Sequence, residues 1–346
     1  MSFSIEDLVV PAEITPDWIA MVRVRNEVEA EAVGNYDLSR EPGELLPKWQ
    51  NPLERKAMVL ARVDGEIVGR GVYETDTDSL TTWVSVEVLP AFRNRGIGST
   101  LHDRLVQLAR AEGKTAMQDY VTEKVSDTTD VIDSPTGFGS VPRDTASSRF
   151  LLKHGYALEQ VGRMSRLDLP VDISMLHSEA MDVAGPNYVV RTYVGRTPEE
   201  LLEDMAALRR SMSDAPSGGM DTESAWTADR VRADDDAMEN SPRTMLTAMV
   251  HHSPSGEVAG YTELDVPPEL HRPVAQGDTI VVAAHRGHRL GMLLKLANIA
   301  FLEEVGPGHP SITTSNAVDN THMLAVNEAV GFVAWASMGA WKKPLD

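Results

Sequence analysis

The chain has 346 residues, of which 42% are hydrophobic, and its formal net charge is −20. This length favours about two domains, and the apolar content suffices for two ordinary cores. The negative charge argues against a nucleic-acid partner, since clustered Lys and Arg provide most of the affinity for phosphodiester backbones. It favours a cationic small molecule, unless it serves only solubility.

Cysteine is absent from the sequence, which excludes disulfides, thiolate metal sites and a cysteine nucleophile. Residues 1–7 lack the basic and apolar regions of a signal peptide. No run reaches the roughly 18–20 apolar residues that a membrane span requires. We therefore expect a cytoplasmic protein without a membrane partner, either a monomer or a homodimer.

The first predicted helix begins at Thr15-Pro16-Asp17, where an N-cap threonine precedes a proline and an early acid. Gly65 predicts the turn of a hairpin over residues 64–69. A strand-like segment, Trp83–Val88, then leads into a glycine-rich turn at residues 93–98. The helix after this turn should pack one face on a sheet, because apolar residues recur at helical spacing at Leu101, Leu105, Leu108 and Ala109.

The turn Arg93-Asn94-Arg95-Gly96-Ile97-Gly98 is suited to hold a pyrophosphate. At the start of a helix, successive backbone N–H groups have no intrahelical partner, and the helix dipole favours an anion there. Glycine lets phosphates come close to the backbone because it has no Cβ. The turn lacks both the dinucleotide-binding fingerprint and the Gly-Lys-Ser/Thr of a Walker A loop.

The rest of the first half predicts a strand over Thr115–Val121, a short helix ending at Gly155-Tyr156 and a strand over Met164–Leu169. The polar connection Thr122–Arg143 is long, so it is either a mobile lid over a site or a solvated surface loop. The segment Pro170–Pro186 predicts a domain boundary. We place an N-terminal domain at residues 1–172, a linker at 173–187 and a C-terminal domain at 188–346.

The second half repeats this order of elements. Thr197-Pro198-Glu199 predicts a helix start, Ser255–Gly260 a hairpin, and Arg286–Gly291 a second glycine-rich turn. The helix after this turn is apolar nearly all round, which predicts burial on two sides. A strand-like run over Ser311–Ser315 and a short helix ending at Gly331-Phe332 follow. The matched spacing indicates a duplicated fold.

The pattern V-x-V-x-P followed by R-x-x-G-x-G, a helix, a strand and a helix ending in Gly-aromatic resembles the GCN5-related N-acetyltransferase (GNAT) superfamily. The resemblance covers most of both halves and is closest over Val86–Pro90 and Arg93–Gly98. It implies an α/β fold of two tandem domains, each a mixed, splayed sheet flanked by helices, with acetyl-CoA as the cofactor. In the second half Ala283 replaces the proline and Arg289 stands in the place of Gly96, which argues against tight pyrophosphate binding there.

The resemblance also implies which residues contact the cofactor. Backbone groups near Val86 and Val88 would meet the pantetheine arm, the amides of residues 95–99 would bind the pyrophosphate, and arginines would add charged contacts. The implied set in the first half is Val86, Val88, Arg93, Asn94, Arg95, Gly96, Ile97, Gly98 and Ser99. In the second half it is Val281, Arg286, Gly287, His288, Arg289, Gly291 and Asn320.

A tyrosine that often serves as the family's proton donor has no counterpart in either half. In the family, an asparagine eleven residues before the Gly-aromatic pair commonly contacts the cofactor, and a tyrosine four residues before it often protonates the thiolate. The second half has Asn320 and Asn327 at these places, and the first half has Asp144 and Leu151. The asparagines, with Asn316, are either ligand contacts or cap and turn residues.

Transfer of an acetyl group to an amine requires a group that removes a proton from that amine. We expect Glu87 in the first half and Glu263 in the second to be the catalytic carboxylates. Other candidates for proton transfer are Glu74, Asp119, Tyr120 and Tyr156.

The histidines show no H-E-x-x-H or comparable spacing, so we expect no metal. The predicted activity is acetyl-CoA-dependent N-acetyl transfer to a primary amine of a small polar or cationic acceptor, with the cofactor held mainly by the first half. Residues 26–52 and 209–242 should select the acceptor. Catalysis by the second half, as in mycothiol-synthase-like tandem enzymes, is one alternative. A CoA-binding sensor or scaffold without turnover is another.

Overall fold

A computed structural model describes residues 2–76, 79–214, 216–221 and 226–345. The first half contains β1 (Ser4–Leu8), α1 (Pro16–Val33), α2 (Pro42–Trp49), β2 (Glu54–Val63), β3 (Glu66–Asp76), β4 (Thr81–Val88), α3 (Ile97–Ala111), β5 (Ala116–Lys124), β6 (Val131–Asp133), β7 (Ser140–Pro142), α4 (Ala146–Lys153) and β8 (Ala157–Asp168). The second half contains α5 (Ser174–Ala184), β9 (Tyr188–Val194), α6 (Leu202–Arg210), α7 (Ala228–Glu239), β10 (Thr244–His252), β11 (Val258–Val266), β12 (Val274–Val281), α8 (Leu290–Val305), β13 (Ser311–Ala317), α9 (Thr321–Val330) and β14 (Val333–Pro344).

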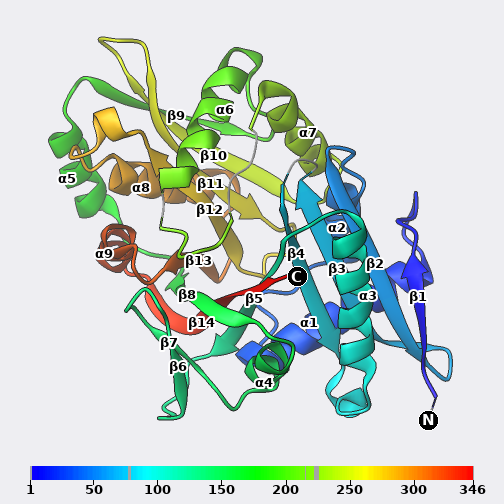
Figure 1. The fold of residues 1–346 in the computed structure, drawn as a ribbon. Helices are drawn as coiled ribbons and strands as arrows, with labels where there is room; N and C mark the ends of the chain where they lie inside the picture. The colour runs from blue at the N-terminus through cyan, green and yellow to red at the C-terminus, as the bar shows by residue number, and fades with distance from the viewer. Residues whose placement is uncertain (1, 77–78, 215, 222–225, 346) are drawn as a thin grey trace.

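The larger strands form one 12-stranded sheet in the order β1-β2-β3-β4-β5-β14-β8-β13-β12-β11-β10-β9. The β4–β5 and β12–β13 pairs are parallel, and the other pairs in this sheet are antiparallel. Helices cover both faces (Figure 1). The mixed α/β fold with a duplicated arrangement of elements, predicted from the sequence, is therefore confirmed.

The last strand of each half pairs with the other half. Strand β14 lies between β5 and β8, with Trp341 opposite Asp119 on one side and Leu158 on the other. Strand β8 in turn pairs with β13, where Leu167 lies opposite Ile312. The red strand beside β5 and β8 in Figure 1 is β14. Each half thus completes the sheet of the other.

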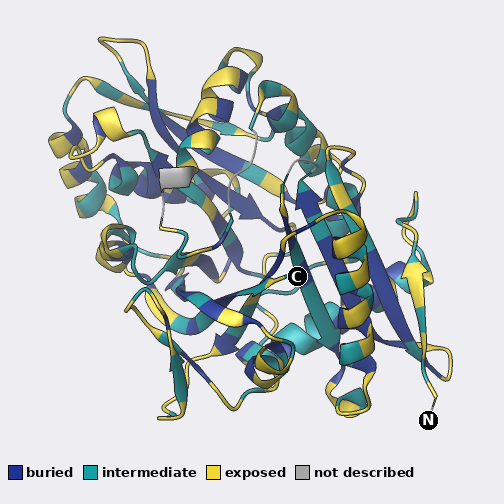
Figure 2. Ribbon diagram, viewed as in Figure 1, coloured by how far each residue is buried: buried dark blue, intermediate teal, exposed yellow. Residues whose placement is uncertain are grey.

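The hydrophobic cores follow this exchange. Trp341 of β14 is buried with the first half's core, and Leu167 of β8 is buried with the second half's core. Helix α3 packs closely on β3, where a Cβ at Gly71 would lie 3.3 Å from Leu105. Figure 2 shows α3 exposed on its outer side over strands that are largely buried. The amphipathic pattern of this helix is the reason for its orientation.

Three segments differ from the simplest expectation. The predicted linker contains α5, whose Ala180 and Ala184 are buried in the second half's core. Thr15 caps α1 by accepting a hydrogen bond from the Trp18 amide, but its counterpart Thr197 bonds Asp235 and no regular helix begins until Leu202. The long connection after β5 forms the separate β6–β7 pair.

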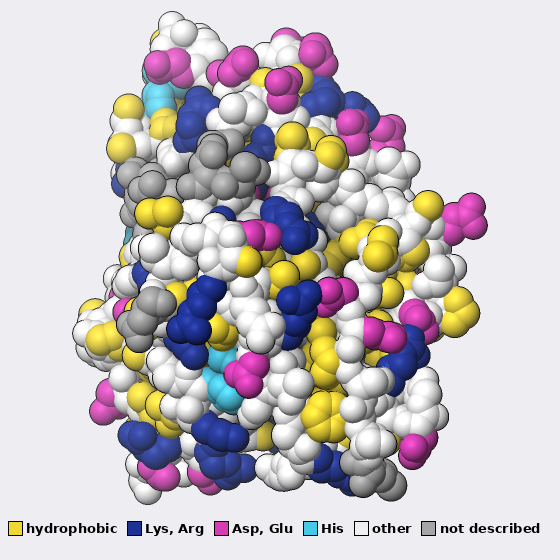
Figure 3. Space-filling view, turned by 45° about the vertical axis from the view of Figure 1, so that its right-hand side comes forward, with side chains coloured by type: hydrophobic (Ala, Val, Ile, Leu, Met, Phe, Trp, Pro, Cys, Tyr) yellow, Lys and Arg dark blue, Asp and Glu magenta, His cyan; other side chains and the backbone are white. Residues whose placement is uncertain are grey.

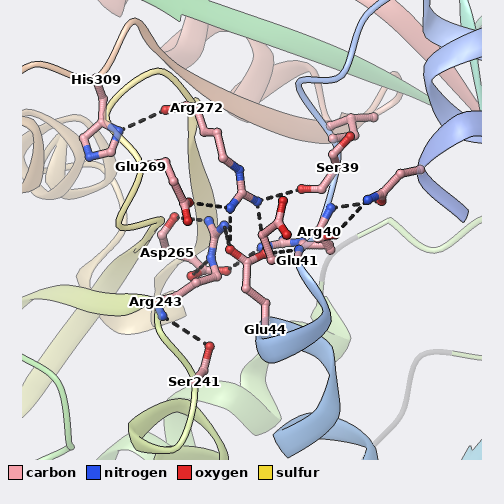
Figure 4. Close-up of polar contacts among 12 residues, drawn as sticks. Ser39, Arg40, Glu41, Glu44, Ser241, Arg243, Asp265, Glu269, Arg272 and His309 are labelled. Atoms are coloured by element: carbon pink, nitrogen blue, oxygen red, sulfur yellow. Dashed lines mark hydrogen bonds and ion pairs between the residues drawn. The ribbon is translucent and has the colours of Figure 1, made fainter. Parts of the chain in front are cut away.

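Ion pairs of α2 and α7 join the two halves. Glu44 of α2 is 1% exposed and accepts hydrogen bonds from Arg272 at 2.6 Å and Arg243 at 3.3 Å (Figure 4). In the reciprocal contact, Arg230 of α7 donates to Asp76 at 2.9 Å and Glu54 at 3.3 Å. Helix α2 of the first half and helix α7 of the second therefore each contact the opposite half.

Positive and negative side chains are also interspersed on the surface. On the face drawn in Figure 3, Lys and Arg side chains are interspersed with Asp and Glu. None of the helices in the described part of the chain combines the length and apolarity needed to cross a bilayer.

Candidate cofactor and acceptor site

The two parallel strand pairs separate after a few residues. Strand β4 pairs with β5 only from Thr81 to Trp83, and β12 pairs with β13 only at Val274 and Ala275. Beyond these points the facing edges of the strands have no ladder partner, so backbone N–H and C=O groups are available to an extended ligand. Val86 and Val88 lie in the separated part of β4, as expected.

The first glycine-rich turn places its backbone in the left-handed region twice. Asn94 has φ 60° and Gly96 has φ 85°, and α3 begins at Ile97. A Cβ at Gly96 would meet no atom within 4 Å, so the space above the turn is open. Within the described residues, the backbone N–H groups of Ile97, Gly98 and Ser99 donate to no protein acceptor. The turn thus presents N–H groups to solvent at a helix N-terminus.

The second turn has the same backbone with its residue types exchanged. Gly287 has φ 89° and Arg289 has φ 53°, and α8 begins at Leu290. The first arginine of each turn also has the same role, because Arg93 Nε donates to Val88 O at 2.9 Å and Arg286 Nε donates to Val281 O at 3.1 Å. The replacement of Gly96 by Arg289 therefore changes the side chain above the turn and leaves its shape intact.

The arginines of the first turn contact protein groups. Arg93 forms an ion pair with Glu31 of α1, and Arg95 donates to Ala91 O at 2.8 Å while lying over the Phe92 ring. Two side chains from the C-terminal end of α4 approach the turn instead. His154 Nε2 lies 3.1 Å from Ser99 Oγ, and Lys153 Nζ donates to Ser99 Oγ at 3.3 Å.

Sequence reasoning did not find Lys153 and His154, because the fold rather than the local sequence brings α4 to this turn. Asn320, at the corresponding place in the second half, caps α9 by accepting from the Met323 amide at 3.2 Å. The side-chain amide of Asn327 donates to Asn316 Oδ1 at 2.6 Å. The three asparagines therefore cap α9 and join it to the end of β13.

Glu87 is held by a buried arginine on the α1 side of the sheet. Arg70 is 5% exposed and donates to both carboxylate oxygens of Glu87, at 2.8 and 3.0 Å. Ser85 Oγ donates to the same carboxylate at 3.3 Å. Arg70 lies directly opposite Glu87 in the β3–β4 register, and strand alternation could have revealed the pair. The ion pair restricts the movement of the Glu87 side chain.

Asp119 of β5 is the carboxyl group without such a partner. It is buried, and within the described residues no basic side chain pairs with it. Burial, together with the charge of Glu87, raises the pKa of Asp119 well above its usual range. Burial and the charge of Asp119 also raise the pKa of Tyr156. Asp119 and Glu87 therefore lie close enough to affect each other at the strand separation, and the raised pKa of Asp119 makes its carboxylate a candidate proton acceptor.

Glu263 of β11 occupies a comparable environment in the second half. Arg209 of α6 donates to it at 3.1 Å, and burial raises the pKa of Glu263 although Arg209 acts in the opposite direction. Tyr261 is buried nearby and donates to Asp278 at 3.1 Å. Glu263 and Arg209 line a cavity of about 510 Å³ between the halves, to which the first half contributes Lys48 and Lys56.

A smaller cavity of about 210 Å³ lies next to it on the first half's sheet. Both cavities are lined by Glu54 and Lys56, and the smaller one is also lined by Glu74 and Trp83. Trp83 stacks on Tyr120 of β5 with ring centroids 4.8 Å apart. Acidic and aromatic side chains therefore lie on the α1 side of the sheet, where β4 and β5 begin to separate.

Comparison with known families fits this geometry. Residues 21–126, which run from α1 past β5 and contain the first turn, match the model of the acetyltransferase (GNAT) family. Over this segment the chain is similar to the acetyltransferase (GNAT) family. No curated protein sequence matches the chain.

Solved structures show the same fold for the chain as a whole. A tandem GNAT protein from the clavulanic acid biosynthesis pathway is 22% identical, with a TM-score of 0.76 over 99% of this chain and 98% of that one. A GCN5-related N-acetyltransferase from Sphaerobacter thermophilus is 16% identical, with a TM-score of 0.63 over 99% of this chain and 95% of that one. A fungal GCN5-related glucosamine N-acetyltransferase region is 15% identical at a TM-score of 0.63, over 99% of this chain and 38% of the multi-domain protein that contains it. The likeness extends over both halves and confirms the two-domain GNAT fold that the sequence predicts.

Proposed function

We propose that this acetyltransferase moves an acetyl group from acetyl-CoA to a primary amine of a small polar or cationic acceptor, and that the first half holds the cofactor. The observation that carries the proposal is the first glycine-rich turn. Its unbonded amides begin α3 directly beyond the point where β4 and β5 separate, inside the segment that matches the GNAT family. Fold likeness alone does not identify a function.

The residues present fit acetyl-CoA. The open space above Gly96 admits a phosphate to the backbone, and the amides of residues 97–99 with Lys153 and His154 would bind the pyrophosphate. Backbone groups of β4 near Val86 and Val88 would hold the pantetheine arm. When bound, acetyl-CoA supplies an acyl group activated as a thioester.

The chain's own contribution to the chemistry is proton removal. An acceptor amine must lose a proton to become a nucleophile, and a carboxylate whose pKa is raised is suited to accept it. We assign this role to Asp119. Glu87, fixed by Arg70, would stabilise the cationic amine from the other side of the strand separation.

The side of the sheet opposite α3 suits a basic acceptor. Glu74 and Trp83 line the smaller cavity there, and carboxylates and aromatic faces both attract ammonium groups. The acceptor named for the fungal region, glucosamine, is also a small amine. A panel of amino sugars, polyamines and amino acids is the appropriate first screen.

Calorimetry with acetyl-CoA on Gly96→Glu tests the cofactor site. Gly96 and Gly113 both have left-handed backbones, and a Cβ at either would meet no atom within 4 Å. Gly113→Glu therefore introduces the same kind of strain at the far end of α3. We expect Gly96→Glu to weaken acetyl-CoA binding by at least about tenfold, equivalent to ~1.4 kcal/mol, and Gly113→Glu to leave it unchanged.

Catalysis in the second half is supported by a separate observation. The second turn has the same backbone as the first, and Glu263 lines the larger cavity. If Gly291→Glu abolishes acetyl-CoA binding and Gly96→Glu does not, the cofactor belongs to the second half. Binding without release of thiol in the presence of the amine panel would instead favour a sensor.

A further inference from the structure

Three segments of the second half bring two histidines and a glutamate together at one end of the sheet. His252 ends β10, Glu257 immediately precedes β11, and His285 lies in the short turn between β12 and α8. One ligand atom from each side chain lies within 4.8 Å of the other two. The sequence showed no metal motif because His285 lies far along the chain from His252 and Glu257, and only the fold brings it to them.

Hydrogen bonds already orient both imidazole rings. Tyr188 Oη lies 3.0 Å from Nδ1 of His285, and Ser255 Oγ lies 2.8 Å from Nδ1 of His252. With Nδ1 occupied, each ring presents Nε2 as its remaining donor atom. Such contacts to the second ring nitrogen are typical of histidines that ligate a metal.

The carboxylate belongs to the same arrangement. Glu257 Oε2 lies 3.3 Å from His285 Nε2 and accepts from Ser255 Oγ at 2.9 Å. His285 is buried, whereas the Glu257 side chain is 67% exposed, so the group has one fixed ligand and one that faces solvent. The rings of His252 and His285 are 4.9 Å apart between centroids. A small rotation of the exposed carboxylate would bring the three ligands to a common centre.

We propose that His252, Glu257 and His285 bind a divalent transition-metal ion of the Zn²⁺ type, with water in the fourth position. Two imidazoles and a carboxylate are a ligand set that Zn²⁺ accepts in tetrahedral geometry, and they disfavour Mg²⁺ and Ca²⁺, which prefer oxygen ligands alone. The ion would connect the β10–β11 hairpin to the turn that precedes α8. It would thereby fix the second glycine-rich turn, residues 286–291, from outside the proposed cofactor site of the first half.

A second histidine cluster provides the matched control. His102 and His154 lie 4.2 Å apart between ring centroids and are grouped with the exposed Asp103. In that cluster, however, Nε2 of His154 is already bonded to Ser99, and His102 is enclosed by Phe150 and Tyr156. Removal of His154 should therefore leave the proposed metal site intact.

Titration of the full chain with Zn²⁺ tests the proposal. We expect one ion per chain, and a Kd raised by at least about 100-fold in His285→Ala and His252→Ala and about tenfold in Tyr188→Phe, which removes only the orienting hydroxyl. His154→Ala should bind as the unaltered protein does. Co²⁺ should give the visible absorption of a tetrahedral nitrogen and oxygen site. Equal Zn²⁺ affinity in all variants, or a loss confined to His154→Ala, would overturn the assignment. Because His252 is only partly buried, His252→Ala remains informative if His285→Ala fails to fold.

Discussion

The environment of Asp119 determines what a single carboxyl group can do in this fold. Its pKa is raised by burial and by the charge of Glu87, whereas Glu87 itself is neutralised by Arg70. The two carboxyl groups at one strand separation thus differ in their partners, since Glu87 has an arginine and Asp119 has none among the described residues. This separation of roles is typical of acid–base sites.

Replacement of Asp119 by asparagine should lower kcat by about 100-fold or more, because the amide cannot accept the proton of the acceptor amine. In the unaltered protein, kcat should rise with pH through the raised pKa of Asp119, since only the ionised form acts as a base. A pH profile of kcat on the two proteins measures both effects.

Glu123→Gln is the matched control for this experiment. Glu123 is also a buried carboxyl group of β5 whose pKa is raised by burial, but it lies further along the strand, opposite Ser337 of β14, where Asp119 lies opposite Trp341. An Asp119→Asn enzyme with an unchanged pH profile, or an equal loss in Glu123→Gln, would refute the role of Asp119.

His102 should make the protein sensitive to acid. It is 2% exposed, its ring nitrogens have no hydrogen-bond partner among the described residues, and Asp103 is 3.8 Å away. Burial lowers the pKa of His102 to about 4. The unfolded chain therefore takes up this proton first, and stability is lost as the pH falls from about 6.5 toward 4.

His102→Leu should remove this loss, which amounts to about 3 kcal/mol of unfolding free energy across that pH range. Urea unfolding at several pH values measures the slope. His177→Leu, at a partly exposed position of α5, serves as the comparison and should leave the slope unchanged. A parallel slope in His102→Leu and the unaltered protein would contradict the prediction.

At the scale of elements, the two glycine-rich turns show what a local pattern can predict. Their positions after a strand and before a helix followed from residue types and spacing, and the structure confirms both elements in each half. The pattern did not predict that Arg289 would adopt the left-handed conformation of Gly96. A non-glycine residue reaches that region at a modest cost, which the surrounding fold can impose.

The sequence did not predict which strands pair with each other. The strand-like residues 164–169 were recognised, but nothing within β8 or β14 specifies which edge it joins, because pairing partners far apart in the chain are selected by the assembled sheet. The helix within residues 173–187 was missed for a different reason. Only Ala180 and Ala184 of α5 are fully buried, with Leu176 packed beside them, and polar residues between them hide the apolar face.

Trp341→Ala should destabilise the first half although the residue belongs to the last strand. Trp341 is 1% exposed within that half's core, and removal of a large buried side chain costs about 3–5 kcal/mol. Hydrogen exchange should show lost protection in β5 and α3. Trp335→Ala, in the same strand but only partly buried, should cost less. Equal costs for the two tryptophans would contradict the assignment of Trp341 to the first core.

At the scale of the whole molecule, the buried ion pairs of α2 should couple the two halves. Glu44 faces Arg243 and Arg272, and these arginines lower the pKa of Glu44 despite its burial. Glu44→Gln would leave two largely buried guanidinium groups short of a counter-charge, which costs about 3–5 kcal/mol when one partner of a buried pair is removed.

Denaturant unfolding followed by far-ultraviolet circular dichroism measures this loss. We expect a lower midpoint and a single transition for both proteins, because the halves share one sheet. Glu41→Gln changes a neighbouring carboxylate that is exposed and should have little effect. A midpoint unaffected by Glu44→Gln would show that the ion pairs contribute no coupling.

The reciprocal placement of β8 and β14 constrains how such a chain can diverge. A half that loses its ligand-binding side chains still supplies the strand on which its counterpart depends, so it persists as a scaffold after its chemistry is gone. Substitutions should then be tolerated at the turn of one copy and disfavoured along β8 and β14, on which both copies depend. The sequence should therefore change most slowly in β14 and β8, where the two copies pair, whichever copy retains turnover.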